Sequence, residues 1–347
     1  MNRDAGKVIT VRGLIEPTAL GKVLMHEHVH ADVFDPATNM PIETEEPTRP
    51  QRREFLLREA LPWLTKLNDF GCHALVEASP PPTRAWPTML QELSQRSGTH
   101  LIQSTGFYRE VELGHYWATK PEYQIWPYVR RASVEELADF CTREILEGIH
   151  GTDVRAGVIK LAASAPTMTE AEDKAFRAGA RAQLATGVHI TTHCTSRGAE
   201  SSQLKLLEIE GVDLRRVVIG HAAWHLIDRV WCAICLDWMK RGANFMPTNL
   251  FFFDPAERAN HDRRYWQPLV DGIHRVFDAG HGDKLVLGLD SGFGSEEKTF
   301  KFLGFNAPPP WCHMFTHTLP NFRAMGLSAD QENAMIRINP QRILPVC

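Results

Sequence analysis

VLMHEHVH, residues 23–30, is the stretch that decides the fold. Its first half is apolar, as expected of a buried strand, and its second half places histidines at alternate positions. Successive side chains of a strand point to opposite sides, so His26 and His28 project together from one face. A strand that ends in paired imidazoles indicates a candidate metal site, and the rest of the chain must supply its other ligands.

Apolar strand-like runs alternate with helical stretches along the whole chain. Capping-box pairs predict two helix starts, at Ser133 with Glu136 and at Thr169 with Glu172, and Gly187 predicts a helix end. The eight predicted strands are 23–30, 73–79, 99–105, 156–162, 188–194, 216–222, 243–248 and 284–290.

This α/β alternation predicts a closed (β/α)₈ TIM barrel, formed as a single domain over residues 1–347. An open doubly wound sheet is the alternative. Against it, HEHVHAD stands after the first strand where a GxGxxG turn would be expected. The Pro-rich, charged segment 36–62 is interpreted as a long loop that leads into a helix.

Composition narrows the class of partner. The net charge is −4, and no stretch concentrates basic and aromatic residues, so nucleic acid is not an expected partner. The N-terminus has no apolar core of a signal peptide, and no apolar run is long enough to span a bilayer. VWCAICLDWM (230–239) is predicted to be a buried helix. The expected partner is a small molecule.

The seven cysteines are scattered and odd in number, which predicts reduced thiols and a cytoplasmic location. Cys232 and Cys235 form a CxxC pair without a second pair. We interpret them as packed helix residues in preference to a zinc or redox pair.

Ligand-type residues recur at the C-terminal ends of the predicted strands. In a barrel these ends meet on one face, where active sites lie. A single strand-end histidine is usually a hydrogen-bonded structural group, but together these residues predict a binuclear metal centre. The six residues are His26 and His28 on the first strand, Lys160 on the fourth, His193 on the fifth, His221 on the sixth and Asp290 on the eighth.

The chemistry of this set suits two divalent cations. Imidazole and carboxylate bind zinc, which we expect first, with manganese or cobalt as alternatives. An ammonium on Lys160 would repel a cation, but a buried lysine is readily neutral. A neutral lysine can react with carbon dioxide to give a carbamate, so a carboxylated Lys160 could bridge two metals. A hydroxide shared between them would be a strong nucleophile.

Several further segments carry a family likeness, in order, over nearly the whole chain. They are GLIEPTALGKVLMHEH (13–28), STGFY (104–108), SVEELADFCTREILEGIHGT (133–152), AGVIKLA (156–162), ARAQLATGVHITTH (180–193), EGVDLRRVVIGH (210–221), LGLDSGFG (287–294) and NPQRIL (339–344). With them the chain resembles the phosphotriesterase-like family of the amidohydrolase superfamily, whose members are binuclear (β/α)₈ barrels that hydrolyse phosphotriesters or lactones.

The resemblance implies roles for individual residues. Asp290 would also act as the general base, and a homodimer is expected. Tyr108 falls where lactonase-like members place a tyrosine beside the metals. The implied ligands are His26, His28 and Asp290 for the more buried metal, His193 and His221 for the more exposed one, and carboxylated Lys160 as the bridge. His30 is expected to lie outside the ligand set, and Glu27 to face away from it.

We therefore predict hydrolysis of a lactone or carboxylic ester, with weak activity on organophosphates. Another bond (phosphotriester, amide or carbamate) is the first alternative, and a catalytically silent metal-binding or ligand-binding barrel is the second.

Two segments depart from the family pattern: HAAWHLID (221–228) and MPTNLFFFD (246–254) lack the acidic residues that family members often carry there. The outward proton relay from Asp290 is therefore expected to be altered. Glu77, Arg109 and His225 are candidates for either substrate contacts or structural roles. An aromatic pocket is expected from Trp224, Phe251, Phe252, Phe253, Phe293 and Trp311.

Overall fold

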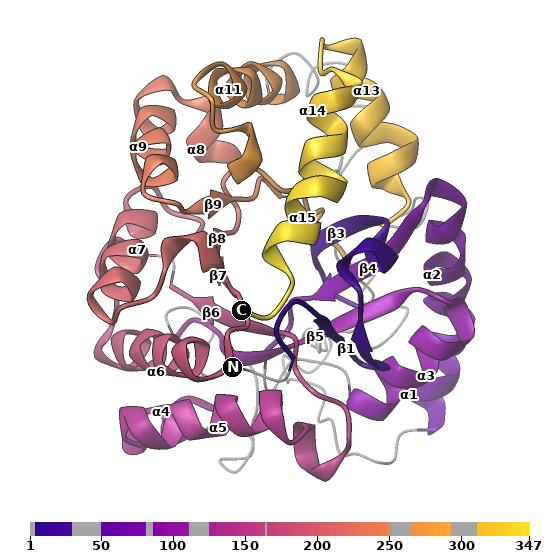
Figure 1. Cartoon of the computed structure of the whole chain (residues 1–347), viewed down its shortest axis with the longest axis vertical. Coiled ribbons are helices and arrows are strands. Elements are labelled where there is room, and N and C mark those ends of the chain that lie inside the picture. The colour runs from indigo at the N-terminus through magenta and orange to yellow at the C-terminus, as the bar shows by residue number, and fades with distance from the viewer. Residues whose placement is uncertain are drawn as a thin grey trace, which may run out of the picture.

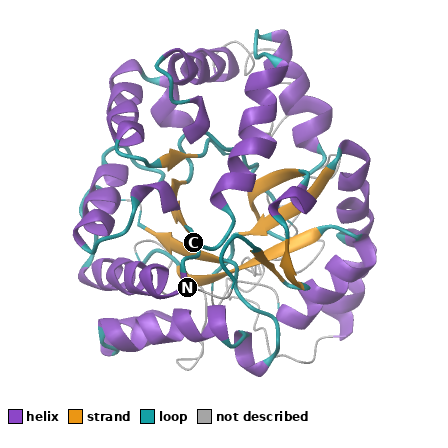
Figure 2. Ribbon diagram, in the orientation of Figure 1, coloured by secondary structure: helices purple, strands orange, loops and turns teal. Residues whose placement is uncertain are grey.

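Parallel strands curve around the centre of the molecule, and helices surround them (Figure 1; Figure 2). The computed structural model describes residues 4–29, 50–80, 86–110, 125–163, 165–248, 250, 265–292 and 311–347. Within these residues, the strands of the curved sheet are β3 (Lys22–Glu27), β4 (Cys72–Glu77), β5 (His100–Phe107), β6 (Val158–Ala162), β7 (Ile190–His193), β8 (Val217–Ile219) and β9 (Asn244–Phe245).

The helices begin largely where local signals predict. Ser133 and Thr169 form capping boxes with Glu136 and Glu172, and Gly187 ends its helix with φ 75°. The described helices are α1 (Pro50–Glu59), α2 (Leu61–Leu67), α3 (Pro87–Ser97), α4 (Ile125–Arg131), α5 (Val134–Leu146), α6 (Glu170–Thr186), α7 (Ala199–Ile209), α8 (Ala223–Ile227), α9 (Arg229–Lys240), α11 (Gln267–Asp278), α13 (Leu319–Ala324), α14 (Ala329–Asn333) and α15 (Asn339–Ile343). None of these is both long and apolar enough to cross a membrane.

The strand order β3-β4-β5-β6-β7-β8-β9 makes each strand the spatial neighbour of the next one in sequence. A doubly wound sheet would reverse its order at a switch point. The ring closes through residues 285–292, which bond to the strands on both sides. Val286 N–H donates to the Phe245 carbonyl at 3.1 Å, and Met25 N–H donates to the Leu287 carbonyl at 3.0 Å. The predicted barrel class is confirmed.

Several predicted strands are shorter or less regular than expected, among them β8, which spans only Val217–Ile219 of the predicted 216–222. Gly282–Lys284 forms a 3₁₀ turn, so the eighth strand cannot begin at residue 284. The following extended segment has only isolated bridges within the described residues, at its two ends. β9 ends at Phe245 because Pro247, two residues on, has no N–H to donate to a ladder.

The barrel interior is apolar at one end, below the predicted site. Val23, Met25, Val158, Val218 and Val286, drawn from strands around the ring, belong to one buried cluster. An antiparallel pair that the sequence analysis missed, β1 (Val8–Thr10) and β2 (Gly13–Ile15), adds its own apolar side chains to that cluster. The polar side chains are thereby confined to the opposite end, where the strands terminate.

A β-bulge in β3 lies directly before the paired histidines. Leu24 pairs with Leu75 and Glu27 pairs with Glu77, so β3 uses one residue more than β4 over this span. An extra residue in one strand re-aims the side chains that follow it. The bulge therefore lets Met25 join the apolar interior while His26, the next residue, points into the site.

The close approach of β5 to β6 gives a test of this packing. Gly106 has φ 117°, and a Cβ there would lie 2.0 Å from the Lys160 carbonyl oxygen; Gly13 has φ 105° in open space. Gly13→Ala should lower the free energy of unfolding by only the backbone strain, about 1–3 kcal/mol. Gly106→Ala should lower it further. Equal losses in chemical denaturation would contradict the close approach.

Candidate metal centre

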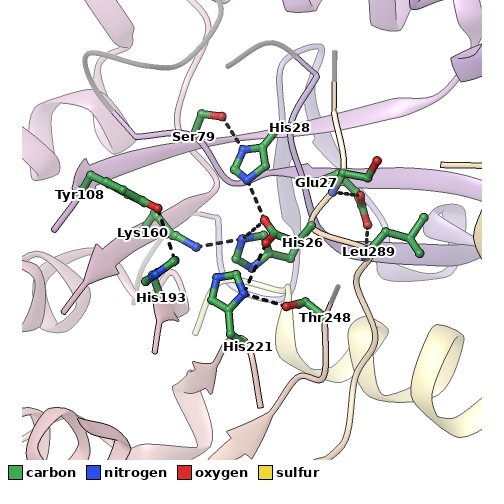
Figure 3. A network of polar contacts seen from close by, with 12 residues as sticks. His26, Glu27, His28, Ser79, Tyr108, Lys160, His193, His221, Thr248 and Leu289 are labelled. Atoms are coloured by element: carbon green, nitrogen blue, oxygen red, sulfur yellow. Dashed lines mark hydrogen bonds and ion pairs between the residues drawn. The ribbon is translucent and has the colours of Figure 1, made fainter. Parts of the chain in front are cut away.

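Six side chains, two of them from the end of β3, converge at the polar end of the barrel (Figure 3). His26 ends β3 next to Glu27, Lys160 lies in β6, His193 ends β7, and His221 follows β8. The ring centroids of His26 and His221 are 4.9 Å apart, and those of His193 and His221 are 4.2 Å apart. The structure thus brings together all the residues that the sequence analysis selected as ligands.

Lys160 and His26 are the most deeply buried side chains of this group. Their Nζ and Nε2 atoms lie 3.0 Å apart, and both side chains are 1% exposed. Burial lowers the pKa of Lys160 to about 7, and the pKa of His26 is lowered well below its ordinary value, first by burial and then by Lys160. Both groups can therefore be neutral near pH 7, which is the state that a cation requires of them.

Asp290, from the C-terminal part of the chain, contacts histidines from the N-terminal part. Its Oδ1 lies 3.0 Å from His28 Nε2 and 3.5 Å from His26 Nε2, and its Oδ2 lies 3.4 Å from His221 Nδ1. Burial raises its pKa, but the surrounding imidazoles lower the pKa more, to well below the ordinary value. His26, His28 and Asp290 each offer one ligand atom, all within 4.8 Å of one another.

His193 packs edge-on against His221. Its pKa is lowered well below the ordinary value, by burial first and then by neighbouring cations that include Arg109. Its Nε2 is buried without a hydrogen-bond partner in the described part of the chain. A neutral ring with such a nitrogen fits a metal, because a buried lone pair without a partner is otherwise unfavourable. The Tyr108 hydroxyl lies 3.4 Å from His193 Nδ1.

Two hydroxyls orient the imidazoles from behind. Ser79 Oγ lies 2.7 Å from His28 Nδ1, and Thr248 Oγ1 lies 2.8 Å from His221 Nδ1. Metal-binding histidines commonly use their second nitrogen in the way that His28 does, which fixes the orientation of the ring. The sequence analysis did not select Ser79, although it ends a predicted strand like the ligands themselves.

Glu27, between the paired histidines, points away from them as predicted and binds the backbone around Asp290. Its Oε1 accepts from Leu289 N–H at 2.6 Å and its Oε2 accepts from Ser291 N–H at 3.1 Å (Figure 3). Asp290 between those amides has φ 61°, a conformation that few residues other than glycine adopt. Glu27 therefore holds Asp290 in an otherwise unfavourable backbone conformation.

Residues 6–344 match the sequence model of the Phosphotriesterase family. The chain belongs to the phosphotriesterase family. The resemblance inferred from the segments above is confirmed, and with it the class of metal-dependent hydrolases.

Relatives in this family have several activities. A phosphotriesterase homology protein from Mycobacterium tuberculosis is 26% identical over 339 residues, which covers 96% of each chain. An N-acetyltaurine hydrolase from Salmo salar is 26% identical over 368 residues and 99% of each chain. A mutant phosphotriesterase-like lactonase from Deinococcus radiodurans superposes with a TM-score of 0.75 at 26% identity, over 97% of this chain and 99% of that chain.

Several other residues considered as pocket or substrate contacts lie elsewhere. His225 is buried against Glu200, and Trp311 is fully buried, with its indole N–H on the Ser291 carbonyl. Trp224 is exposed and packs edge-on against Tyr265. The first two side chains are buried in structural contacts, and Trp224 is exposed. His30, Phe251, Phe252, Phe253 and Phe293 lie outside the described residues.

The role of Glu27 can be tested by Glu27→Gln. The new NH₂ group cannot accept, so one backbone amide beside Asp290 loses its partner. Stability should fall by about 1–3 kcal/mol, and metal affinity in chelator competition should fall about 10–100-fold. Glu144→Gln is the matched control, because Glu144 is a buried carboxylate on α5 that accepts from the Thr105 hydroxyl. If both variants kept wild-type metal affinity, the proposed link to Asp290 would be wrong.

Proposed function

We propose that this chain hydrolyses a carbonyl substrate, a lactone or carboxylic ester, at a binuclear metal centre. The observation that carries the proposal is the convergence of four imidazoles, one carboxylate and a buried lysine at one barrel mouth. The proposed ligands are His26, His28 and Asp290 for one cation, His193 and His221 for the other, and carboxylated Lys160 for both. Zinc is the proposed metal, with manganese or cobalt as substitutes.

When bound, two divalent cations supply a water of lowered pKa and a Lewis acid for the bond under attack. Asp290 is ionised at working pH, because its pKa is low, and its oxygens can accept the proton that the nucleophile releases. The Tyr108 hydroxyl, beside His193, is suited to hydrogen-bond the substrate carbonyl. Lys160 contributes as the neutral amine that takes up carbon dioxide and releases a proton.

Amide hydrolysis is the second candidate function. It is favoured by the relatives named N-acetyltaurine hydrolases, which align over nearly all of this chain. The substrate in that name is an amide that carries a sulfonate. The Arg109 guanidinium lies 5.8 Å from the Tyr108 ring centroid, and its charge lowers the pKa of His193. A cation beside Tyr108 suits a substrate with an anionic group.

The Lys160 assignment predicts a pH dependence of metal loading. Since the pKa of Lys160 is about 7, the ammonium dominates below pH 7 and the reactive amine dominates above it. Metal uptake by metal-free protein in bicarbonate should therefore rise as the pH increases through about 7. Metal content after desalting at each pH measures this.

Lys160→Ala should lose the bridged metal and reduce activity more than about 100-fold, and a small carboxylate in the buffer should restore part of both. Lys174→Ala, which removes a lysine on α6 bonded to backbone carbonyls, is the control. Full activity and unchanged metal content in Lys160→Ala would refute the bridge.

The substrate class can be tested with metal-loaded enzyme on lactones, aryl esters, N-acyl amides with and without an anionic group, and organophosphates. Lactone or ester hydrolysis supports the first proposal. Tyr108→Phe should then lower kcat about 100-fold, as for loss of one donor to a developing oxyanion, while Tyr128→Phe on α4 should have no effect. If anionic amides are preferred, Arg109→Gln should raise KM for them and leave neutral substrates unchanged. No metal-dependent turnover of any compound would refute both functions.

A further inference from the structure

A second group of metal-ligand side chains lies buried outside the barrel mouth. Cys194, Glu200 and His225 are each 0% exposed. Their ligand atoms lie within 4.8 Å of one another. Among the described residues, only this trio and the group of His26, His28 and Asp290 meet that condition.

The trio connects three separate elements. Cys194 follows the end of β7, Glu200 is in the first turn of α7, and His225 is in α8. His225 Nε2 lies 3.1 Å from Glu200 Oε2, and that oxygen also accepts from Gly198 N–H at 2.7 Å. Thiolate, imidazole and carboxylate are all zinc ligands, and a site that includes a thiolate favours zinc over magnesium or calcium.

The polar atoms of the group are only partly satisfied within the described residues. The pKa of Glu200 is lowered: burial alone would raise it, but the hydrogen bond from His225 and other contacts outweigh burial. His225 Nδ1 is buried without a hydrogen-bond partner in the part of the chain that is described. A bound divalent cation would deprotonate the thiol, neutralise the carboxylate and use an imidazole lone pair.

We propose that Cys194, Glu200 and His225 form a third, structural metal site for a thiophilic divalent cation such as zinc. The site is separate from the proposed binuclear centre and does not depend on it. It adjoins that centre through the chain, because Cys194 follows His193 directly and His225, in α8, lies shortly after His221. A metal here ties together the segments that follow β7 and β8, and so fixes the positions of both preceding histidines.

The test uses a spectroscopic signal that the binuclear centre cannot give. None of its six proposed ligands contains sulfur, so a sulfur-to-cobalt charge-transfer band in the near ultraviolet reports on a thiolate site alone. Full-length protein folded in the presence of cobalt should show this band. Cys194→Ser should abolish the band and lower the metal content by one ion per chain. A wild-type protein without the band, or a Cys194→Ser variant that keeps it, would overturn the proposal.

Matched variants separate this site from other thiols. Cys141→Ser removes another buried thiol, on α5, and Cys347→Ser removes the exposed one. Both should keep the band, and loss of the band in Cys347→Ser alone would identify surface binding and refute the site. If Cys194→Ser does not fold, X-ray absorption of the wild-type zinc protein decides. Sulfur at about 2.3 Å from zinc is expected, and a shell of only nitrogen and oxygen would overturn the proposal.

Discussion

The hydrogen bonds between β3 and the segment 285–292 are the constraint on which the site depends. Asp290 N–H donates to the His26 carbonyl at 2.9 Å, and His28 N–H donates to the Ser291 carbonyl at 2.8 Å. These bonds close the barrel, and the same register sets the Asp290 carboxylate against both histidine rings. The Glu27 carboxylate reinforces the contact by binding amides on either side of Asp290. Closure of the fold and assembly of the site are therefore one event.

Burial then determines the protonation states at the mouth. Charged groups are strongly disfavoured where water is excluded, so His26, His193 and Lys160 all have lowered pKa values. Asp290 instead stays charged, because the imidazoles beside its oxygens lower its pKa more than burial raises it. The result is a set of neutral nitrogen donors around one carboxylate. Such an arrangement favours the binding of cations over the binding of anions.

The sequence predicted which side chains meet at the barrel mouth because a barrel repeats one geometric rule. Residues at the C-terminal ends of parallel strands meet, so strand prediction alone was enough to group Lys160 with His193 and His221. The bulge in β3 and the partners of Glu27 depend on contacts between segments far apart in sequence, and no local pattern encodes them. The shortening of β9 could have been foreseen from Pro247. The Cys194 group was not selected because Glu200 and His225 lie on helices, away from the strand ends that the sequence pattern singles out.

The hydroxyl partners of the imidazoles bear on the reactivity of the proposed centre. Ser79 and Thr248 orient His28 and His221 without adding negative charge. A carboxylate in either place would make the imidazole more electron-donating and would neutralise more of the charge of a bound cation. With hydroxyls there, under the proposed ligand assignment, more positive charge remains to polarise a carbonyl oxygen. That property favours acyl substrates, whose reactivity depends on stabilising a developing oxyanion. Under the proposed function, the strand ends would therefore favour carbonyl chemistry, and the choice between ester and amide would rest with residues beyond them, such as Tyr108 and Arg109.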